Sequence, residues 1–418
     1  MRLVKVVIVS TLVAVSFAVR ATGALCCSGR LLLPSIFGKC IADFCERLGG
    51  AYLKAGQILS TRVDLLPEGT ASALARLRDQ ATPIPFSSLA NAISPLADAG
   101  QGFPKIELSS TPLASATIAQ VHIGTIAGVS QLVAVKVRRP GIERLLKSDI
   151  RHIRVVTRLV ARLPWFRRFP IAEATEEVVS AMLWQSDFVR ETQMLQRFGR
   201  LFQDNQNIKI PKVFHERSTD DLIVMEFLDG YRPIPTFRQD TDSARLAVQT
   251  GLRALYKMIF NAGLIHCDLH ASNILCNQNG RVALLDFGFV AEMTPQAKQS
   301  FSEFFLAIAF RDGKTAARIV RETALRIGPK CNELEFERDM QTLVDKTGGR
   351  KAADFQVAGF VFELFQVQRR HGIYGSPDFT LPILSLLTYE GLIKDIYPDI
   401  DFQQEAVPFI MAALAHNA

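Results

Sequence analysis

One stretch constrains this chain more than any other. The segment from His266 to Asn273, of sequence HCDLHASN, is followed after two short apolar pieces by Asp286-Phe-Gly288. Phosphoryl transfer needs side chains that hold Mg²⁺ on the phosphates and orient a nucleophile, and two carboxylates and an amide from neighbouring loops supply them. We predict Asp268 as the catalytic base and Asn273 and Asp286 as metal ligands, with Gly288 letting the backbone turn beside the metal.

Two other interpretations of this stretch remain open. It could be an ordinary turn between two strands. It could also be a transition-metal site made by His266, Asp268 and His270, which alternate along an extended segment but lack an evident fourth ligand.

A kinase also requires a strand lysine that grips the α- and β-phosphates and a helix glutamate that pairs with it. Lys136 ends the alternating run Val-Ala-Val-Lys, and Glu191 lies in a helical pattern. Alone, Lys136 would be equally well explained as an exposed lysine at a strand end. Together with the downstream loops, both residues are predicted to be catalytic.

Two further segments are predicted to contact the nucleotide. The backbone at Glu226 and Phe227 would bond adenine, because it follows a strand and joins two halves of the chain. A glycine-rich phosphate loop is absent before Lys136, and its place is taken by Ala114, Ser115, Ala116 and Thr117. Side chains there prevent the close backbone approach that glycine allows, so ATP handling should differ from that of ordinary protein kinases.

The order of elements predicts an α+β, bilobal protein-kinase-like fold. Strand patterns at 117–123, 132–137 and 221–228 enclose helical patterns at about 143–163 and 173–200, and the chain after Gly230 is mainly helical. This is the plan of a small N-lobe with inserted helices followed by a helical C-lobe.

The motifs resemble the AarF/UbiB family of atypical kinases. Beyond the loops above, the likeness rests on Lys54-Ala-Gly-Gln57, which continues to Arg62 and Asp64 and is not found in ordinary kinases. The resemblance implies a helical N-terminal extension packed over the active site, with Lys54 and Gln57 reaching toward the nucleotide. It also implies ATP and Mg²⁺ as cofactors.

For function, the resemblance implies an atypical kinase or ATPase that supports ubiquinone (isoprenoid-quinone) biosynthesis at a membrane, with quinone-pathway lipids or enzymes as partners. One alternative is a nucleotide-dependent scaffold or pseudokinase that organises a lipid-biosynthesis complex without phosphoryl transfer. Another is a small-molecule phosphotransferase, although such proteins lack the Lys54 to Gln57 signature.

Three departures from the family pattern are visible. Two alanines of its phosphate loop are Ser115 and Thr117, a Glu-x-Asp pair reads Gln185-Ser-Asp187, and an asparagine is Met194. The lost carboxylate at Gln185 should weaken coupling between the extension and the site.

The net charge of +7 is concentrated in two places. Basic residues exceed acidic ones by five in residues 1–60 and by nine in residues 136–170. Six of the latter, at spacings of 3, 4, 3, 4 and 4, share one face of a helix: Arg144, Lys147, Arg151, Arg154, Arg158 and Arg162. Ile150, Ile153, Leu159 and Leu163 should pack inward.

This basic face is interpreted either as a solvated surface or as a docking site for anionic lipid, while nucleic acid is not expected. The uncharged run 6–19 would be a membrane-contacting segment, a buried helix or a cleaved signal. Seven cysteines without a Cys-x-x-Cys pair favour a reducing compartment. We expect the cytoplasmic face of a bacterial inner membrane, with peripheral or N-terminal anchoring, and a homodimer is possible.

The predicted domains follow from these assignments. They are a hydrophobic basic segment at 1–38, a helical extension at 39–105, an N-lobe with inserted helices at 106–229 and a helical C-lobe at 230–418.

Overall fold

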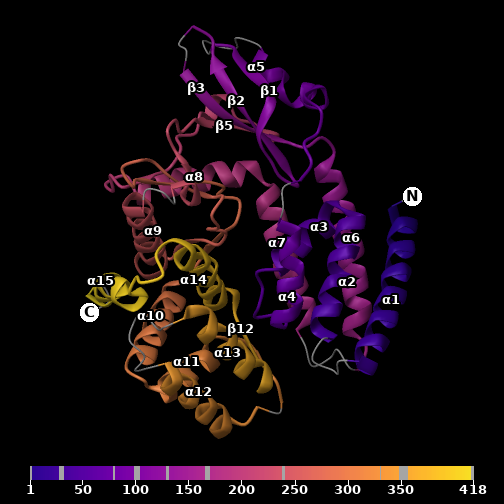
Figure 1. Ribbon diagram of the computed structural model, residues 1–418, viewed down its shortest axis with the longest axis vertical. Helices are drawn as coiled ribbons and strands as arrows, with labels where there is room; N and C mark the ends of the chain where they lie inside the picture. Colours follow the sequence, from indigo (N-terminus) through magenta and orange to yellow (C-terminus); the bar gives the residue numbers. More distant parts are fainter. Residues whose placement is uncertain are drawn as a thin grey trace. The chain divides into compact units, whose positions relative to one another are not determined.

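The computed structural model describes residues 2–27, 33–78, 81–97, 104–128, 131–164, 170–237, 241–329, 331–347 and 356–415. The chain divides into two compact units (Figure 1). The first draws on residues 1–167, 171–193 and 212–227, and the second on residues 168–170, 194–211 and 228–418. Among the basic residues counted in residues 1–60 and 136–170, Arg30, Arg167 and Arg168 lie outside the described residues.

The first unit begins with helices α1 (Arg2–Cys27), α2 (Leu33–Leu48), α3 (Gly50–Leu59) and α4 (Glu68–Leu74) and the 3-10 turn η2 (Ala75–Arg78). Their core includes Ala42, Cys45, Leu74 and Leu77. Gly56 is needed there, because a Cβ at this position would lie 2.5 Å from Cδ1 of Leu77. The absence of a side chain lets α3 approach η2 closely.

One side of helix α1 packs against α2 and α3. Val9 is buried against Leu48 and Tyr52, and Arg2 forms an ion pair with the fully buried carboxylate of Asp149. The opposite side of α1 exposes apolar side chains at Ile8, Leu12, Val15 and Val19. Within the described part of the chain, no helix has the length and apolar character needed to cross a membrane.

A four-stranded antiparallel sheet follows, in the order β1-β2-β3-β5. Its strands are β1 (Ile106–Ser115), β2 (Ala119–Ile126), β3 (Gln131–Arg138) and β5 (Leu222–Glu226), and η3 (Phe86–Leu89) and α5 (Ala90–Ala97) pack near it. Alternation in β3 buries Val133, Val135 and Val137 in the core and leaves Lys136 on the other face. The predicted strands at 132–137 and 221–228 are confirmed, whereas β1 was not predicted.

Three helices are inserted between β3 and β5: α6 (Ile142–Ala161), α7 (Ile171–Ser186) and α8 (Phe188–Leu201). The first matches the predicted helix at 143–163. The prediction of one continuous helix at 173–200 was wrong, because α7 ends at Ser186 and α8 begins at Phe188, with Asp187 between them. The side chain of Asp187 accepts a hydrogen bond from the Arg190 amide at 2.9 Å, which is how an aspartate caps a new helix.

The second unit is mainly helical with short strands. Its helices are the end of α8, α9 (Thr241–Tyr256), a π-helical turn η6 (Lys257–Ala262), α10 (Pro295–Ala309), α11 (Gly313–Glu322), α12 (Glu333–Thr347), α13 (Val357–Arg370), α14 (Pro377–Ile396) and α15 (Phe402–Ala415). Its strands are β4 (Ile208–Lys209), β6 (Arg232–Pro233), β7 (Leu264–His266), β8 (Ile274–Cys276), β9 (Val282–Leu284), β10 (Val290–Glu292), β11 (Ala324–Ile327) and β12 (Ile373–Gly375).

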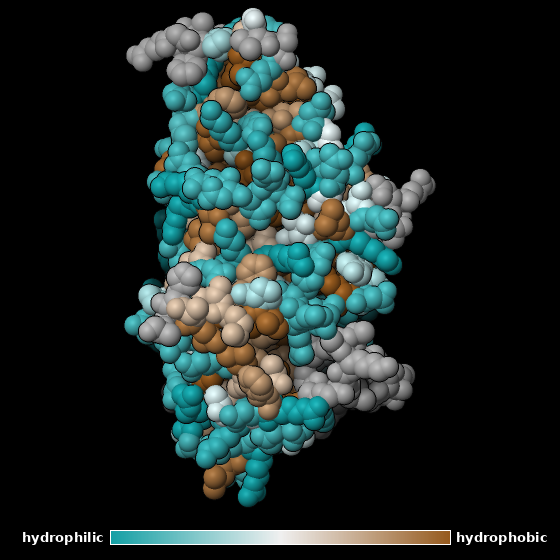
Figure 2. All heavy atoms as spheres, turned by 90° about the vertical axis from the view of Figure 1, so that its left-hand side faces the viewer, coloured by the Kyte–Doolittle hydropathy of each residue, from teal (hydrophilic) through white to brown (hydrophobic). Residues whose placement is uncertain are grey.

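Two small sheets position the predicted catalytic segments. β7 pairs with β10, and β8 and β9 form an antiparallel hairpin. The segment from Cys267 to Asn273 therefore joins β7 to β8, and Asp286 lies two residues after the end of β9. The α+β kinase-like fold predicted from the sequence is confirmed. At the far end of the chain, α15 exposes Val407 and Met411. Apolar side chains gather on the face of the molecule that Figure 2 shows.

Candidate functional site

The lysine of β3 and the glutamate of α8 meet within the first unit. Nζ of Lys136 lies 2.7 Å and 2.8 Å from the two carboxylate oxygens of Glu191. Their side chains are 12% and 2% exposed, so the ion pair is largely shielded from water. Phe188 lies beneath the ammonium group, 5.5 Å from ring centroid to Nζ. Sequence analysis paired these two residues correctly, and their catalytic role stays a prediction.

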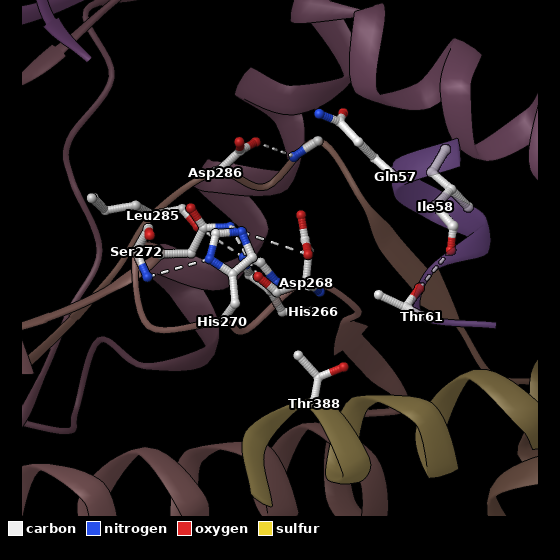
Figure 3. A network of polar contacts seen from close by, with 12 residues as sticks. Gln57, Ile58, Thr61, His266, Asp268, His270, Ser272, Leu285, Asp286 and Thr388 are labelled. Carbon is white, nitrogen blue, oxygen red and sulfur yellow. Dashed lines mark hydrogen bonds and ion pairs between the residues drawn. The ribbon is translucent and has the colours of Figure 1, made fainter. Parts of the chain in front are cut away.

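In the second unit, the fully buried His266 supports the loop that carries Asp268. Its Nδ1 accepts a hydrogen bond from the Asp268 amide at 3.2 Å, so Nε2 carries the proton and donates to the Leu285 carbonyl at 2.9 Å (Figure 3). Burial lowers the pKa of His266 below its ordinary value of 6.5. The neutral ring thereby joins the catalytic segment to the residue that precedes Asp286.

Asn273 is oriented by the same loop. Its Nδ2 donates to the Asp268 carbonyl at 2.9 Å, and its carbonyl accepts the Leu285 amide at 2.9 Å. Among the described residues, no group donates to its Oδ1. An amide oxygen without a donor suits a hard cation such as Mg²⁺, which prefers oxygen ligands.

Asp286 has an unusual backbone. Its φ is +55°, in the left-handed region that non-glycine residues seldom occupy, and its Oδ1 accepts the Gly288 amide at 3.3 Å. This turn places the carboxylate of Asp286 one residue after Leu285, whose amide donates to the Asn273 carbonyl. Asp286 and Asn273 both carry side-chain oxygens of the kind that Mg²⁺ prefers, and their role as its ligands stays a prediction.

His270 belongs to this group, although sequence analysis did not assign it a catalytic role. Its Nε2 lies 3.2 Å from Nδ2 of Asn273 and 3.7 Å from Oδ1 of Asp268. The signal was its alternation with Asp268 along the extended segment. The transition-metal alternative finds no support, because no cluster of three His, Cys, Asp or Glu side chains in the described ranges could hold a metal.

The extension contacts the predicted phosphate loop within the first unit. Gln57 on α3 donates through Nε2 to the Leu77 carbonyl at 2.8 Å, and its Oε1 accepts the Thr117 hydroxyl at 3.4 Å. Lys54 lies one helical turn earlier and is half-buried. Of the predicted loop, Ala114 and Ser115 instead end strand β1, whereas Ala116 and Thr117 follow it; Ala114 and Ala116 are exposed.

A buried ion-pair network holds the rest of the extension motif. The Arg62 guanidinium binds Asp64 at 2.7 Å and Glu177 of α7 at 2.6 Å. Burial opposes its charge, but the two carboxylates prevail and raise its pKa. Burial raises the pKa of Glu177. Sequence analysis missed Glu177, because nothing in a single helical pattern marks which of several glutamates faces a buried arginine.

The predicted adenine-binding edge is partly occupied. The Glu226 amide donates to the Lys212 carbonyl at 2.8 Å. Adenine bonding here would therefore depend on the Glu226 carbonyl and on the backbone of Phe227, and this role stays a prediction.

Two departures from the family pattern have local consequences. Oε1 of Gln185 is buried and accepts no hydrogen bond within the described part of the chain. Met194 is 5% exposed and packs as a core side chain. The first change leaves an orphaned acceptor, which is consistent with a lost charged contact.

The basic face of α6 is only partly as predicted. Arg144, Lys147, Arg151, Arg158 and Arg162 are exposed, whereas Arg154 binds Glu176 at 2.6 Å. Ile150 is buried, but the inward packing predicted for Leu159 and Leu163 was wrong, since they are 58% and 50% exposed. Together with Val155 and Val156 they give the end of α6 an apolar surface beside its arginines.

These features define a kinase-like protein: a strand lysine paired with a helix glutamate, and loops that carry the aspartates and the asparagine predicted to act in phosphoryl transfer. Residues 76–320 match the ABC1 atypical kinase-like domain, and residues 340–401 match the UbiB helical domain. Because the first match covers more than half of the sequence, the chain belongs to the UbiB family of ABC1 atypical kinase-like proteins.

Relatives in bacteria agree with this assignment. A probable protein kinase UbiB of Marinobacter nauticus is 29% identical over 373 residues, which cover 87% of this chain and 68% of the relative. Its counterpart in Aeromonas salmonicida is 30% identical over 374 residues, with the same coverage. The solved complex of Rv3197 with erythromycin from Mycobacterium tuberculosis has a TM-score of 0.57 at 20% identity, covering 87% of this chain and 93% of that one. This last similarity concerns the fold alone.

Proposed function

We propose that the chain binds ATP with Mg²⁺ and acts as an atypical kinase or ATPase that supports ubiquinone biosynthesis at a membrane. The observation that supports this most is the 2.7 Å ion pair of Lys136 and Glu191. In kinase-like proteins this pair holds the lysine on the α- and β-phosphates. The relatives' name, probable protein kinase UbiB, favours the same role.

Each predicted residue then has a task. Asp286 and Asn273 would hold Mg²⁺, which supplies neutralisation of the phosphate charge when bound. Asp268 orients the nucleophile and accepts its proton, and neutral His266 keeps the backbone beneath it in place. Lys54 and Gln57 would contact the nucleotide from the extension, since Gln57 already binds the hydroxyl of Thr117 in the predicted phosphate loop.

Phosphate release tests the catalytic part of this proposal. Wild type and Asp286→Asn are assayed with MgATP, cardiolipin vesicles and a phenolic mimic of a quinone precursor. We expect the variant to release phosphate at least about 100-fold more slowly, because it lacks the metal-binding carboxylate. Equal slow release by both proteins would favour the nucleotide-dependent scaffold instead.

The membrane part rests on α1 and α6, which meet at one apolar cluster: Val9 of α1 is buried in it, and Ile153 of α6 packs against it. Both helices expose apolar residues, and α6 adds exposed arginines. Apolar side chains insert at the lipid boundary, while each basic residue near an anionic surface contributes about 1 kcal/mol.

Vesicle sedimentation tests this surface. Wild type is compared with a variant in which the exposed Arg151, Arg158 and Arg162 are changed to Glu, using vesicles with and without cardiolipin. The proposal expects cardiolipin-dependent binding that the variant loses. Equal binding of both proteins would end the docking idea while leaving the catalytic proposal intact.

A further inference from the structure

The turn between β1 and β2 is held by one side chain that neither the sequence motifs nor the proposed catalytic groups include. Arg139 directly follows β3. Its Nε donates to the Ala116 carbonyl at 2.8 Å, and its Nη2 donates to Oγ of Ser115 at 2.8 Å. Its backbone amide donates to the Ile118 carbonyl at 2.8 Å. A single residue thus contacts three of the four residues from Ser115 to Ile118.

Arg139 also reaches the segment that leaves the extension. Nη2 donates to the Thr82 carbonyl at 2.7 Å. Two residues further on, the backbone of Ile84 is held on β2 by the buried amide of Gln120, which accepts from the Ile84 amide and donates to its carbonyl at 3.4 Å. The turn and the exit of the extension are therefore fastened to the same part of the sheet.

The charge of Arg139 is not neutralised by these partners. All of its acceptors within the described residues are carbonyls or a hydroxyl, and burial lowers its pKa. Its neighbour Arg138 differs, because it has an ion pair with Asp221 at 3.0 Å. Arg139 belongs to the strongly basic segment 136–170, but its hydrogen bonds place it at this turn and not on the basic face of α6.

The hydrogen bonds of this turn occupy its carbonyl groups but not all of its amides. The carbonyls of Ala116 and Ile118 are taken by Arg139, and the Ala116 amide donates to the Ala119 carbonyl at 2.8 Å. The amides of Thr117 and Ile118 find no acceptor among the described residues. Two consecutive amides without acceptors, beside a guanidinium that lacks a carboxylate, match the requirements of a phosphate oxygen.

We propose that Arg139 is a positioning residue for the nucleotide: it clamps the β1–β2 turn to the exit of the extension and so presents the Thr117 and Ile118 amides to a phosphate group. Ser115 replaces a family alanine and gives the clamp an acceptor that alanine lacks. Thr117, the other replaced alanine, adds the contact to Gln57. This inference rests on the proposed nucleotide-binding function.

Hydrogen exchange of the full chain without nucleotide tests the clamp directly. Arg139→Met keeps the aliphatic stem but removes every donor, and we expect amides of residues 112–119 to exchange at least about fivefold faster than in wild type. Arg139→Lys keeps the charge without the planar fork and should give an intermediate rate. Arg144→Met removes an exposed arginine from α6 and serves as the matched control, with wild-type exchange.

Titration with a fluorescent ATP analogue adds the functional readout. We expect Arg139→Met to raise the Kd at least about tenfold, and Ser115→Ala, which removes one acceptor and leaves the core intact, to raise it about threefold. Exchange in Arg139→Met equal to that in Arg144→Met would overturn the clamp. Faster exchange with an unchanged Kd would overturn its link to the nucleotide. A wild type that binds no nucleotide refutes the proposed function, and with it the ligand of this turn, whatever the exchange rates.

Discussion

Lys136 and Glu191 are 55 residues apart in sequence, and their side chains form a 2.7 Å ion pair with little access to water. Strand alternation directs Lys136 away from the valine core, and α8 starts close enough for its first turn to supply the carboxylate. The ion pair fixes the position of the lysine ammonium group. This preorganisation is what the proposed activity requires.

Breaking the pair should affect both stability and activity. Glu191→Gln removes the carboxylate that binds the nearly buried ammonium of Lys136, and we expect it to lower the free energy of unfolding by about 3 kcal/mol. We expect phosphate release to fall by at least about tenfold. Glu176→Gln, which removes an exposed partner of Arg154, is the control and should cost less than about 1 kcal/mol. Similar effects of the two substitutions in denaturant unfolding would contradict the assigned burial.

The buried network of the extension predicts a second stability effect. Arg62→Met removes the guanidinium that binds the carboxylates of Asp64 and Glu177, and it should reduce the free energy of unfolding by about 3–5 kcal/mol. Arg76→Met removes a guanidinium that binds Asp43 and Glu46 at the surface and should cost at most about 1 kcal/mol. Urea denaturation of both variants decides the matter, and equal midpoints would show that Arg62 is not held as described.

Gly56 should not tolerate a side chain. Gly56→Ala places a Cβ 2.5 Å from Leu77 in the packed core, with an expected loss of about 1–3 kcal/mol. Gly199→Ala is the matched control, because nothing lies within 4 Å of a Cβ there and alanine favours the helix by up to about 1 kcal/mol. Thermal unfolding should shift downward for the first variant only. A Gly56→Ala protein as stable as Gly199→Ala would refute the close approach of α3 and η2.

The neutral His266 predicts a pH dependence. Its folded-state pKa lies below 6.5, so the unfolded chain binds a proton that the folded chain does not. The free energy of unfolding should therefore decrease as pH falls below about 6.5, by up to about 1.4 kcal/mol per pH unit until the folded-state pKa is reached. His266→Gln should lack this slope, whereas His215→Gln, at an exposed histidine, should retain it. Identical pH profiles in all three proteins would refute the neutral, buried ring.

Much of the site could be predicted because its residues sit in short local patterns. The strand before Lys136 alternates strictly, and Asp286-Phe-Gly follows a recognisable strand. The boundary between α7 and α8 at Asp187 was missed because aspartate also occurs inside helices, so its presence in a helical pattern does not show that it caps a new helix. The inward packing of Leu159 failed because helical periodicity does not reveal which surfaces other elements cover.

Arg139 was missed for a related reason. In sequence it is one of eleven basic residues between 136 and 170, and nothing distinguishes it from the arginines of α6. Its partners are carbonyls and a hydroxyl on segments 21 to 57 residues away. Backbone acceptors leave no sequence pattern, so only the fold identifies this contact.

The most direct test of the account is equilibrium titration of a fluorescent ATP analogue with and without Mg²⁺. We expect wild type to bind at least about tenfold more tightly with Mg²⁺, because Asp286 and Asn273 supply its oxygen ligands. Asp286→Asn should lose this enhancement, and Asp242→Asn, in the first turn of α9, should keep it. A wild type that shows no saturable binding, or an Asp286→Asn variant with the full effect of Mg²⁺, would contradict the central claim.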